Sequence, residues 1–337
     1  MDQTVIKRFL IPHTAFVNAQ TQIEQCFDSS ADKGEAEGLA IVGETGTGKT
    51  SLLRSFKSEH EPFRGANGMT VPVLYAKVPP GPTVKSLAGV MLAALSADDP
   101  ERGTENEKSW RLRKLMKECQ TRLVMMDEFQ HFIDRGTQRV IHHVADWLKV
   151  LIDDTCSTLI VAGLPYCTGV IDCNEQLARR FLAPIQLPRF DWVDLGQRKQ
   201  FTAILKAFHL EIAKGYEIPN LFSSDMAFRF YCATGGLIGY MAKILRQSLL
   251  NADSKASKAR KSGNSDETVG RIELHDLAVA HMQAVWSAER MSELPKPFEE
   301  SFRLVESVDL LERVSKIGTR IEEPVSLRHA GKGRRSQ

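Results

Sequence analysis

The sequence has no long hydrophobic run, no large excess of charge of one sign and no paired cysteine motif. No segment approaches the roughly 18 uninterrupted apolar residues of a membrane-spanning helix. The first residues also lack the apolar core of a secretory signal, so we expect a cytoplasmic protein with no membrane partner. Because the formal net charge is only +2, nucleic-acid binding has to be argued from local groups rather than from total charge.

Cysteines are few and scattered along the chain. None of them forms a Cys-x-x-Cys pair, and none has the histidine spacing of a zinc site, so we expect reduced thiols at Cys26, Cys119, Cys156, Cys167, Cys173 and Cys232. The length of 337 residues predicts about two domains with a sizeable core.

The most informative stretch is GETGTGKT at residues 43–50, which follows the apolar run 39–42 and precedes a helix-like segment at 51–56. It fits the pattern G-x-x-x-x-G-K-[ST], in which glycines let backbone N–H groups surround phosphate oxygens at a helix N-terminus. An ordinary glycine-rich turn is the alternative, which the strand before and the helix after disfavour. We expect Lys49 to reach the β- and γ-phosphates of ATP and Thr50 to bind Mg²⁺. The predicted nucleotide-binding residues are Gly43, Glu44, Thr45, Gly46, Thr47, Gly48, Lys49, Thr50 and Ser51.

A second motif follows further along the chain. Residues 122–128 form an apolar strand pattern that ends in Asp127 and Glu128, the Walker B arrangement. Such a pattern alone also fits a strand that runs into an acidic turn, but it gains weight downstream of a P-loop. We expect Asp127 to hold the Mg²⁺ site and Glu128 to polarise the attacking water.

Strand and helix patterns alternate up to about Pro188 and predict an α/β fold. Helical patterns dominate from Asp191 onward. Strands are expected at 39–42, 71–78, 122–128, 157–163 and 183–187, with helices at 13–27, 51–56, 84–95, 105–118, 137–153, 197–214, 224–234, 239–250 and 273–290. The predicted organisation is an N-terminal extension and helix (1–37), a nucleotide-binding domain (38–189), a helical lid (190–291) with a polar loop inserted at 253–270, and a charged tail (292–337) that is flexible or binds a partner.

The motifs together resemble one family. In chain order they are Arg8–Pro12, GETGTGKT, Val73–Pro80, LVMMDEFQHF, LIVAGLP, NEQLARRF and QLPRF. This order, from about residue 7 to 190, resembles the TniB/TnsC family of transposition AAA+ ATPases. The early Phe-Leu-Ile-Pro and the pairing of QLARRF with a following Leu-Pro-Arg-aromatic distinguish this family from AAA+ proteins in general.

The resemblance implies an AAA+ P-loop fold with a five-stranded parallel sheet, flanking helices and a small α-helical lid. It implies ATP-dependent binding of double-stranded DNA without sequence specificity, by a homo-oligomer that is a ring or a helical filament. Members connect a target-selection protein to the transposase subunits, and some serve CRISPR-associated transposons. Arg179 or Arg180 matches the arginine finger, which acts on the nucleotide of a neighbouring subunit; a surface pair of arginines at a helix end is the alternative.

Two departures from the AAA+ pattern favour slow hydrolysis, with ATP acting mainly as an assembly switch. The strand at 159–164 has no polar side chain at its end, where many AAA+ proteins carry a sensor residue. The segment 235–240 has no sensor arginine, and Lys243 is the nearest cation.

DNA contacts are predicted on loops that could track phosphates through Lys, Arg or Thr side chains. The candidates are Thr83, Lys85, Arg135, Thr137 and Arg139. Ordinary solvated cations are the alternative for each of them.

Two other functional classes stay open. A replication initiator or helicase loader would share the fold and DNA binding, but we find no helix-turn-helix pattern in the C-terminal segment. An ATP-driven signalling or secretion scaffold would bind protein and not DNA, so a test for duplex binding separates it from the other two.

Overall fold

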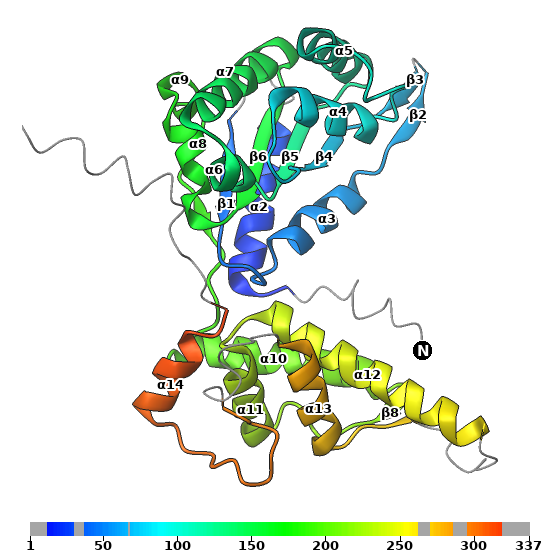
Figure 1. Cartoon of the computed structure of the whole chain (residues 1–337), viewed down its shortest axis with the longest axis vertical. Helices are drawn as coiled ribbons and strands as arrows, with labels where there is room; N and C mark the ends of the chain where they lie inside the picture. Colours follow the sequence, from blue (N-terminus) through cyan, green and yellow to red (C-terminus); the bar gives the residue numbers. More distant parts are fainter. Residues whose placement is uncertain (1–11, 30–36, 67, 262–269, 286–294, 319–337) are drawn as a thin grey trace, which may run out of the picture. The chain divides into compact units, whose positions relative to one another are not determined.

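The computed structural model describes residues 12–29, 37–66, 68–261, 270–285 and 295–318 (Figure 1). By their contacts the described residues form two compact units. The α/β unit comprises those between 14 and 187 except 45–47, and the helical unit comprises those between 188 and 318 together with 12–13 and 45–47. The chain passes between the main bodies of the units after Leu187, where the predicted alternation of strand and helix ends.

A parallel sheet of five strands, in the order β4-β5-β6-β1-β7, forms the centre of the α/β unit. The predicted five-stranded parallel sheet is therefore confirmed. Strands β1 and β5 both pair with β6, so the loops that follow them leave the same edge of the sheet on either side of β6. Ligands bind at this kind of position in open α/β sheets. The strands are β1 Leu39–Val42, β4 Val73–Lys77, β5 Leu123–Asp127, β6 Thr158–Gly163 and β7 Ile185–Gln186.

Helices cover both faces of the sheet, which explains why the strands are nearly continuous apolar runs. Helices α2 (Thr14–Ser29) and α3 (Lys49–Glu59) contact one face. On the other face, strand residues such as Val124 and Val161 share a core with α4 (Val84–Ala94), α5 (Glu105–Glu118) and α7 (Gln138–Thr155). The short helices are α6 His131–Arg135, η1 Pro165–Thr168, α8 Gly169–Asp172 and α9 Glu175–Ala178.

One hairpin was not predicted. The glycines and proline between His60 and Gly68 are typical of a loop, but β2 (Phe63–Gly65) pairs with β3 (Gly68–Thr70). Gly68 has a φ of 123°, a backbone conformation that favours glycine. The glycines therefore belong to a short hairpin rather than to an irregular loop.

The helical unit packs around an aromatic core, in which Trp192 and Phe201 lie against Tyr231. Its elements are α10 Leu195–Ile212, β8 Tyr216–Glu217, α11 Ser224–Thr234, α12 Ile238–Lys261, β9 Gly270–Arg271, α13 Leu274–Ala284 and α14 Val308–Ser315. No described helix of either unit is long and apolar enough to cross a membrane.

Two expectations for this unit were wrong in part. Residues 253–261, expected to begin a polar loop, continue α12. There Asp253 accepts a hydrogen bond from the Tyr216 hydroxyl, and Lys255 donates one to Asp276. Alanine and lysine favour helix, and their contribution outweighed the polar composition. Residues 262–269 lie outside the described residues.

The second difference concerns the charged tail expected from residue 292. Residues 295–318 pack within the helical unit, because four of their apolar side chains are buried in its core: Phe298, Leu310, Val314 and Ile317. Ser307 caps α14 at the Leu310 N–H. Residues 319–337 lie outside the described residues, as do residues 8–11 of the resemblance.

Candidate nucleotide site

The P-loop has the backbone that its glycines predict. Gly46 and Gly48 have φ values of 89° and 102°, which side chains disfavour. Helix α3 begins at Lys49, directly after this turn. The Lys49 ammonium donates to the carbonyl oxygens of Gly43 at 2.6 Å and Glu44 at 2.8 Å. Burial lowers the pKa of Lys49, and the nearby carboxylates oppose that shift.

Thr50 and Asp127 meet although 77 residues separate them in sequence. The Thr50 hydroxyl donates to Asp127 Oδ2 at 2.8 Å, and the Tyr75 hydroxyl donates to the same oxygen at 2.9 Å. Burial first, and then the Asp127 charge, raise the pKa of Tyr75 to about 12. Mg²⁺ prefers oxygen ligands of this kind and retains several waters. A hydroxyl and a carboxylate side by side at the start of α3 and the end of β5 fit such an ion.

Glu128 is held in an unusual backbone conformation. Its φ is 59°, a left-handed value that costs free energy for a residue with a side chain. Its N–H donates to Asp127 Oδ1 at 2.9 Å. The Gln130 amide donates to Glu128 Oε2 at 2.6 Å, while the Lys77 ammonium lies 3.7 Å from Oε1. Gln130 and Lys77 thus contact the two oxygens of the Glu128 carboxylate and fix its orientation.

Sequence reasoning missed Tyr75, Lys77 and Gln130. The first two lie in β4, which pairs with β5, with Lys77 opposite Asp127. The adjacency of parallel strand ends could have suggested them once the strand order was known. Gln130 follows Glu128 by two residues, and no pattern in the sequence indicates that its side chain folds back.

The two arginines proposed as the arginine finger differ. Arg179 forms an ion pair with Glu175 at 2.5 Å and its side chain is 75% exposed, whereas Arg180 pairs with Asp153 at 2.7 Å and is 23% exposed. The carbonyl of Arg180 also accepts the Gly38 N–H at 2.6 Å. Arg180 therefore tightens the α/β unit, while Arg179 extends into solvent.

The predicted DNA-contacting cations were expected on loops but lie at helix ends of the α/β unit: Lys85 in the first turn of α4, Arg135 as the last residue of α6 and Arg139 in the first turn of α7. All three are exposed. A Cβ placed on Gly81 would lie 4.0 Å from Arg135 Cδ, so the loop before α4 adjoins the end of α6. The Thr83 and Thr137 hydroxyls cap α4 and α7.

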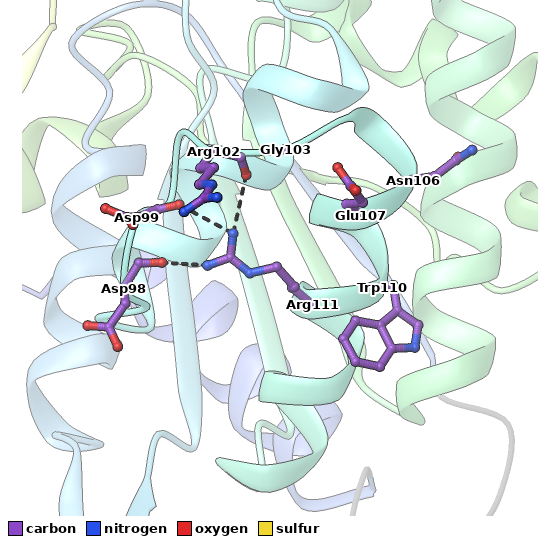
Figure 2. Close-up of a pocket in the computed structure, with 8 residues that line it drawn as sticks. All are labelled: Asp98, Asp99, Arg102, Gly103, Asn106, Glu107, Trp110 and Arg111. Atoms are coloured by element: carbon purple, nitrogen blue, oxygen red, sulfur yellow. Dashed lines mark hydrogen bonds between the residues drawn. The ribbon is translucent and has the colours of Figure 1, made fainter.

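A separate pocket of about 650 Å³ lies between the loop after α4 and helix α5 (Figure 2). Its Arg111 guanidinium donates to the carbonyl oxygens of Asp99 and Arg102 at 3.3 and 3.2 Å. Arg111 of α5 thus holds the loop between α4 and α5 in place through its backbone carbonyls. None of the predicted site residues lines the pocket.

Solved structures with the same fold include archaeal proteins, whereas no curated protein matches this chain. The Cdc6p protein of Pyrobaculum aerophilum is 16% identical, with a TM-score of 0.56 over 88% of this chain and 75% of that one. The ORC2 protein of Aeropyrum pernix is 14% identical, with a TM-score of 0.58 over 87% and 75%. ORC1 of Aeropyrum pernix, solved in complex with DNA, is 15% identical, with a TM-score of 0.56 over 84% and 69%. At these identities the similarity shows the fold alone, which is the AAA+ P-loop fold.

A family model described as "Bacterial TniB protein" matches residues 3–192. The match covers more than half of the 337 residues. It contains the P-loop, the two carboxylates at the end of β5 and the arginine pair, and it confirms the resemblance seen in the motif order. The chain therefore belongs to the TniB family of AAA+ ATPases.

Proposed function

We propose that this chain is an ATP-dependent regulator of DNA transposition, which oligomerises on double-stranded DNA and links a target-selection protein to the transposase. The observation that carries the proposal is the TniB match over residues 3–192. In that segment Lys49 and Thr50 of α3 lie at the same edge of the sheet as Asp127, the last residue of β5, and Glu128, which follows it. The family supplies the role, and the geometry supplies a site suited to ATP.

In this proposal each of the four residues at the start of α3 and the end of β5 has a distinct task. Thr50 and Asp127 hold Mg²⁺, which when bound neutralises charge on the phosphates. Lys49 exchanges its two backbone carbonyl partners for phosphate oxygens. Glu128 accepts a proton from water as the water oxygen bonds to the γ-phosphorus and the bond from that phosphorus to the oxygen of the leaving ADP breaks.

Hydrolysis in this proposal depends on assembly. Arg179 fits the arginine finger better than Arg180, because its guanidinium is exposed and can reach a neighbouring subunit. Its ion pair with Glu175, four residues away, is also exposed, and such a pair costs little free energy to break. A finger supplied by the next subunit makes a lone subunit a poor ATPase. With no polar side chain in the last residues of β6, we expect slow turnover even in the assembly, below about 10 s⁻¹, the median for enzymes.

The DNA surface is proposed around the first turns of α4 and α7 and the end of α6, which carry Lys85, Arg139 and Arg135. These cations are exposed, and Arg135 approaches Gly81 in the loop that precedes α4. Contacts to phosphates hold DNA without reading its sequence, which suits a protein whose target is chosen by a partner.

The test is binding of a fluorescent random-sequence duplex, followed by anisotropy with no nucleotide, with ADP and with a non-hydrolysable ATP analogue. Particle size is measured in the same samples. We expect tight binding and large assemblies only with the ATP analogue. Replacing Lys85 or Arg135 by Ala should weaken binding on all sequences and flatten its salt dependence. Lys117→Ala, which removes an exposed lysine of α5, is the matched control.

The other outcomes identify the alternatives. If no duplex binds in any nucleotide state, the protein is an ATPase that acts on protein partners. If the protein instead forms assemblies of one fixed size, and only on duplexes that carry one particular sequence, a replication initiator is favoured. That role would be in keeping with the fold shared with the ORC1 protein solved in complex with DNA.

A further inference from the structure

Gln130 places a buried amide between two strand ends of the nucleotide site. Its Nε2 lies 2.6 Å from Glu128 Oε2, and its Oε1 lies 3.2 Å from the Leu164 nitrogen, just after β6. Only 6% of its surface is exposed. The Leu164 N–H is a donor, so the amide oxygen faces it and the amide NH₂ group faces the carboxylate. Both ends of the amide are therefore fixed.

The end of β6 is shaped to receive this amide. A Cβ on Gly163 would lie 2.8 Å from Gln130 Oε1, which is too close for a nonbonded carbon and oxygen. Residues 159–164 have no polar side chain of their own. Glycine at the end of the strand thus leaves room for a polar group that arrives from the neighbouring loop.

The amide also acts on a residue that needs support. Glu128 has the left-handed φ of 59°, and such a conformation persists only where its surroundings hold it. The cation that forms an ion pair with this carboxylate, Lys77, is 3.7 Å away on a side chain that is 59% exposed. A buried hydrogen bond to a charged group is the stronger restraint.

We propose that Gln130 is a positioning residue for ATP hydrolysis, whose amide ties the Glu128 carboxylate to the end of β6 and supplies there the polar group that the strand lacks. This inference rests on the proposed ATPase function. With Oε2 occupied by the amide, Oε1 is the oxygen that accepts the proton of the attacking water. A misplacement of about 1 Å can lower a rate about 100-fold.

The test compares Gln130→Met with Gln283→Met in steady-state ATP hydrolysis by the full chain on duplex DNA. Methionine keeps the length of the side chain and removes the amide. Gln283 is an exposed glutamine of α13 with one side-chain hydrogen bond, to Asn251. We expect Gln130→Met to lower kcat by about 10- to 100-fold, with KM and the affinity for a fluorescent ATP analogue within about twofold of wild type, and Gln283→Met to change neither.

A second variant gives a readout that a loss of packing would not produce. Gln130→Glu keeps an acceptor for the Leu164 N–H, but places a second carboxylate against Glu128. The two carboxylates repel each other at this distance, so Glu128 loses its position although the side-chain length and the acceptor are kept, and kcat should fall at least as far as in Gln130→Met with KM within about twofold of wild type. An unchanged kcat in either Gln130→Met or Gln130→Glu overturns the inference alone. If wild type and Gln283→Met also fail to hydrolyse ATP on DNA, the proposed ATPase function fails and the inference fails with it.

Discussion

The two units satisfy their fully buried hydroxyls in different ways. In the α/β unit the buried Ser157 and Thr158 hydroxyls donate to carbonyls 36 and 132 residues away, and at the strand ends the half-buried Thr50 and Tyr75 hydroxyls reach Asp127 over 77 and 52 residues. In the helical unit the buried hydroxyls of Thr234 and Ser248 donate to carbonyls four and three residues away on their own helices.

This difference between local and long-range hydrogen bonds indicates which unit contains the reactive site. Local hydrogen bonds satisfy a buried hydroxyl at little cost and create no site. Long-range polar contacts among a threonine, a tyrosine and a carboxylate require the fold to bring them together against the desolvation cost of the charge. We therefore assign the reaction to the α/β unit, and we expect changes in the two units to separate into losses of activity and losses of stability.

The largest expected effect is on hydrolysis, from Arg179→Ala. If Arg179 is the arginine finger, the rate of the DNA-bound assembly should fall by about 10³-fold, with nucleotide binding and the melting temperature unchanged. Arg180→Ala is the matched control, since it breaks the half-buried pair with Asp153 and should lower stability more than rate. The measurements are steady-state hydrolysis and thermal unfolding.

A mixing experiment tests whether Arg179 acts between subunits. The Arg179→Ala subunit keeps an intact nucleotide site, and the Lys49→Ala subunit keeps Arg179. Mixed assemblies should therefore regain activity wherever Arg179 of a Lys49→Ala subunit faces the nucleotide of an Arg179→Ala subunit. A loss below tenfold for Arg179→Ala, or no recovery on mixing, contradicts a role on the neighbouring nucleotide.

The next effect is on stability, from Phe201→Ala in the helical unit. Phe201 is fully buried against Trp192 and Tyr231, and such a truncation costs about 3–5 kcal/mol. Chemical denaturation should show the helical unit unfolding first, while the α/β unit still binds a fluorescent ATP analogue. Leu210→Ala, at an exposed position of the same helix, should change little. Equal loss of both units would show that they unfold together.

The α/β unit was the more predictable of the two. Its strands are buried apolar runs bounded by glycine, proline or charged residues, and the P-loop requires glycines at Gly46 and Gly48 for its backbone. The approach of Thr50 to Asp127 followed from their motifs. The side chains that support the site were not predictable, because Tyr75 and Gln130 act through contacts that only the strand order creates.

The helical unit was less predictable in its extent. Helical periodicity indicated four of its helices but not where α12 ends, since alanine and lysine in a polar segment suit both a loop and a solvated helix. The segment 295–318 mixes apolar with charged residues, and its pattern did not distinguish the buried Phe298 and Val314 from the exposed Val305 and Val308. Burial of isolated apolar side chains depends on tertiary contacts that local composition does not encode.

A smaller effect on the nucleotide site is expected from Tyr75→Phe. The change removes a hydrogen bond to charged Asp127, a kind worth about 1.5–3 kcal/mol, so we expect about tenfold more Mg²⁺ to be needed for half-maximal hydrolysis. Tyr166→Phe is the matched control, because its hydroxyl donates to Asp134 at 2.7 Å, a carboxylate outside the predicted site. The measurement is a Mg²⁺ titration at fixed ATP; equal shifts in both variants would assign no special role to Tyr75.

The smallest expected effect is the response of the helical unit to acid. Burial lowers the pKa of His281, against the opposing effect of a backbone hydrogen bond with Ala233. The unfolded chain therefore binds a proton more readily than the fold does below about pH 6.5, the ordinary value for histidine. The stabilisation is complete above that pH and is lost as the pH falls through the lower folded pKa. His281→Gln should reduce the loss of melting temperature between pH 7 and pH 5, while His275→Gln, at an exposed position of the same helix, should not. If both variants keep the full acid response of wild type, protonation of His281 does not limit the stability of this unit.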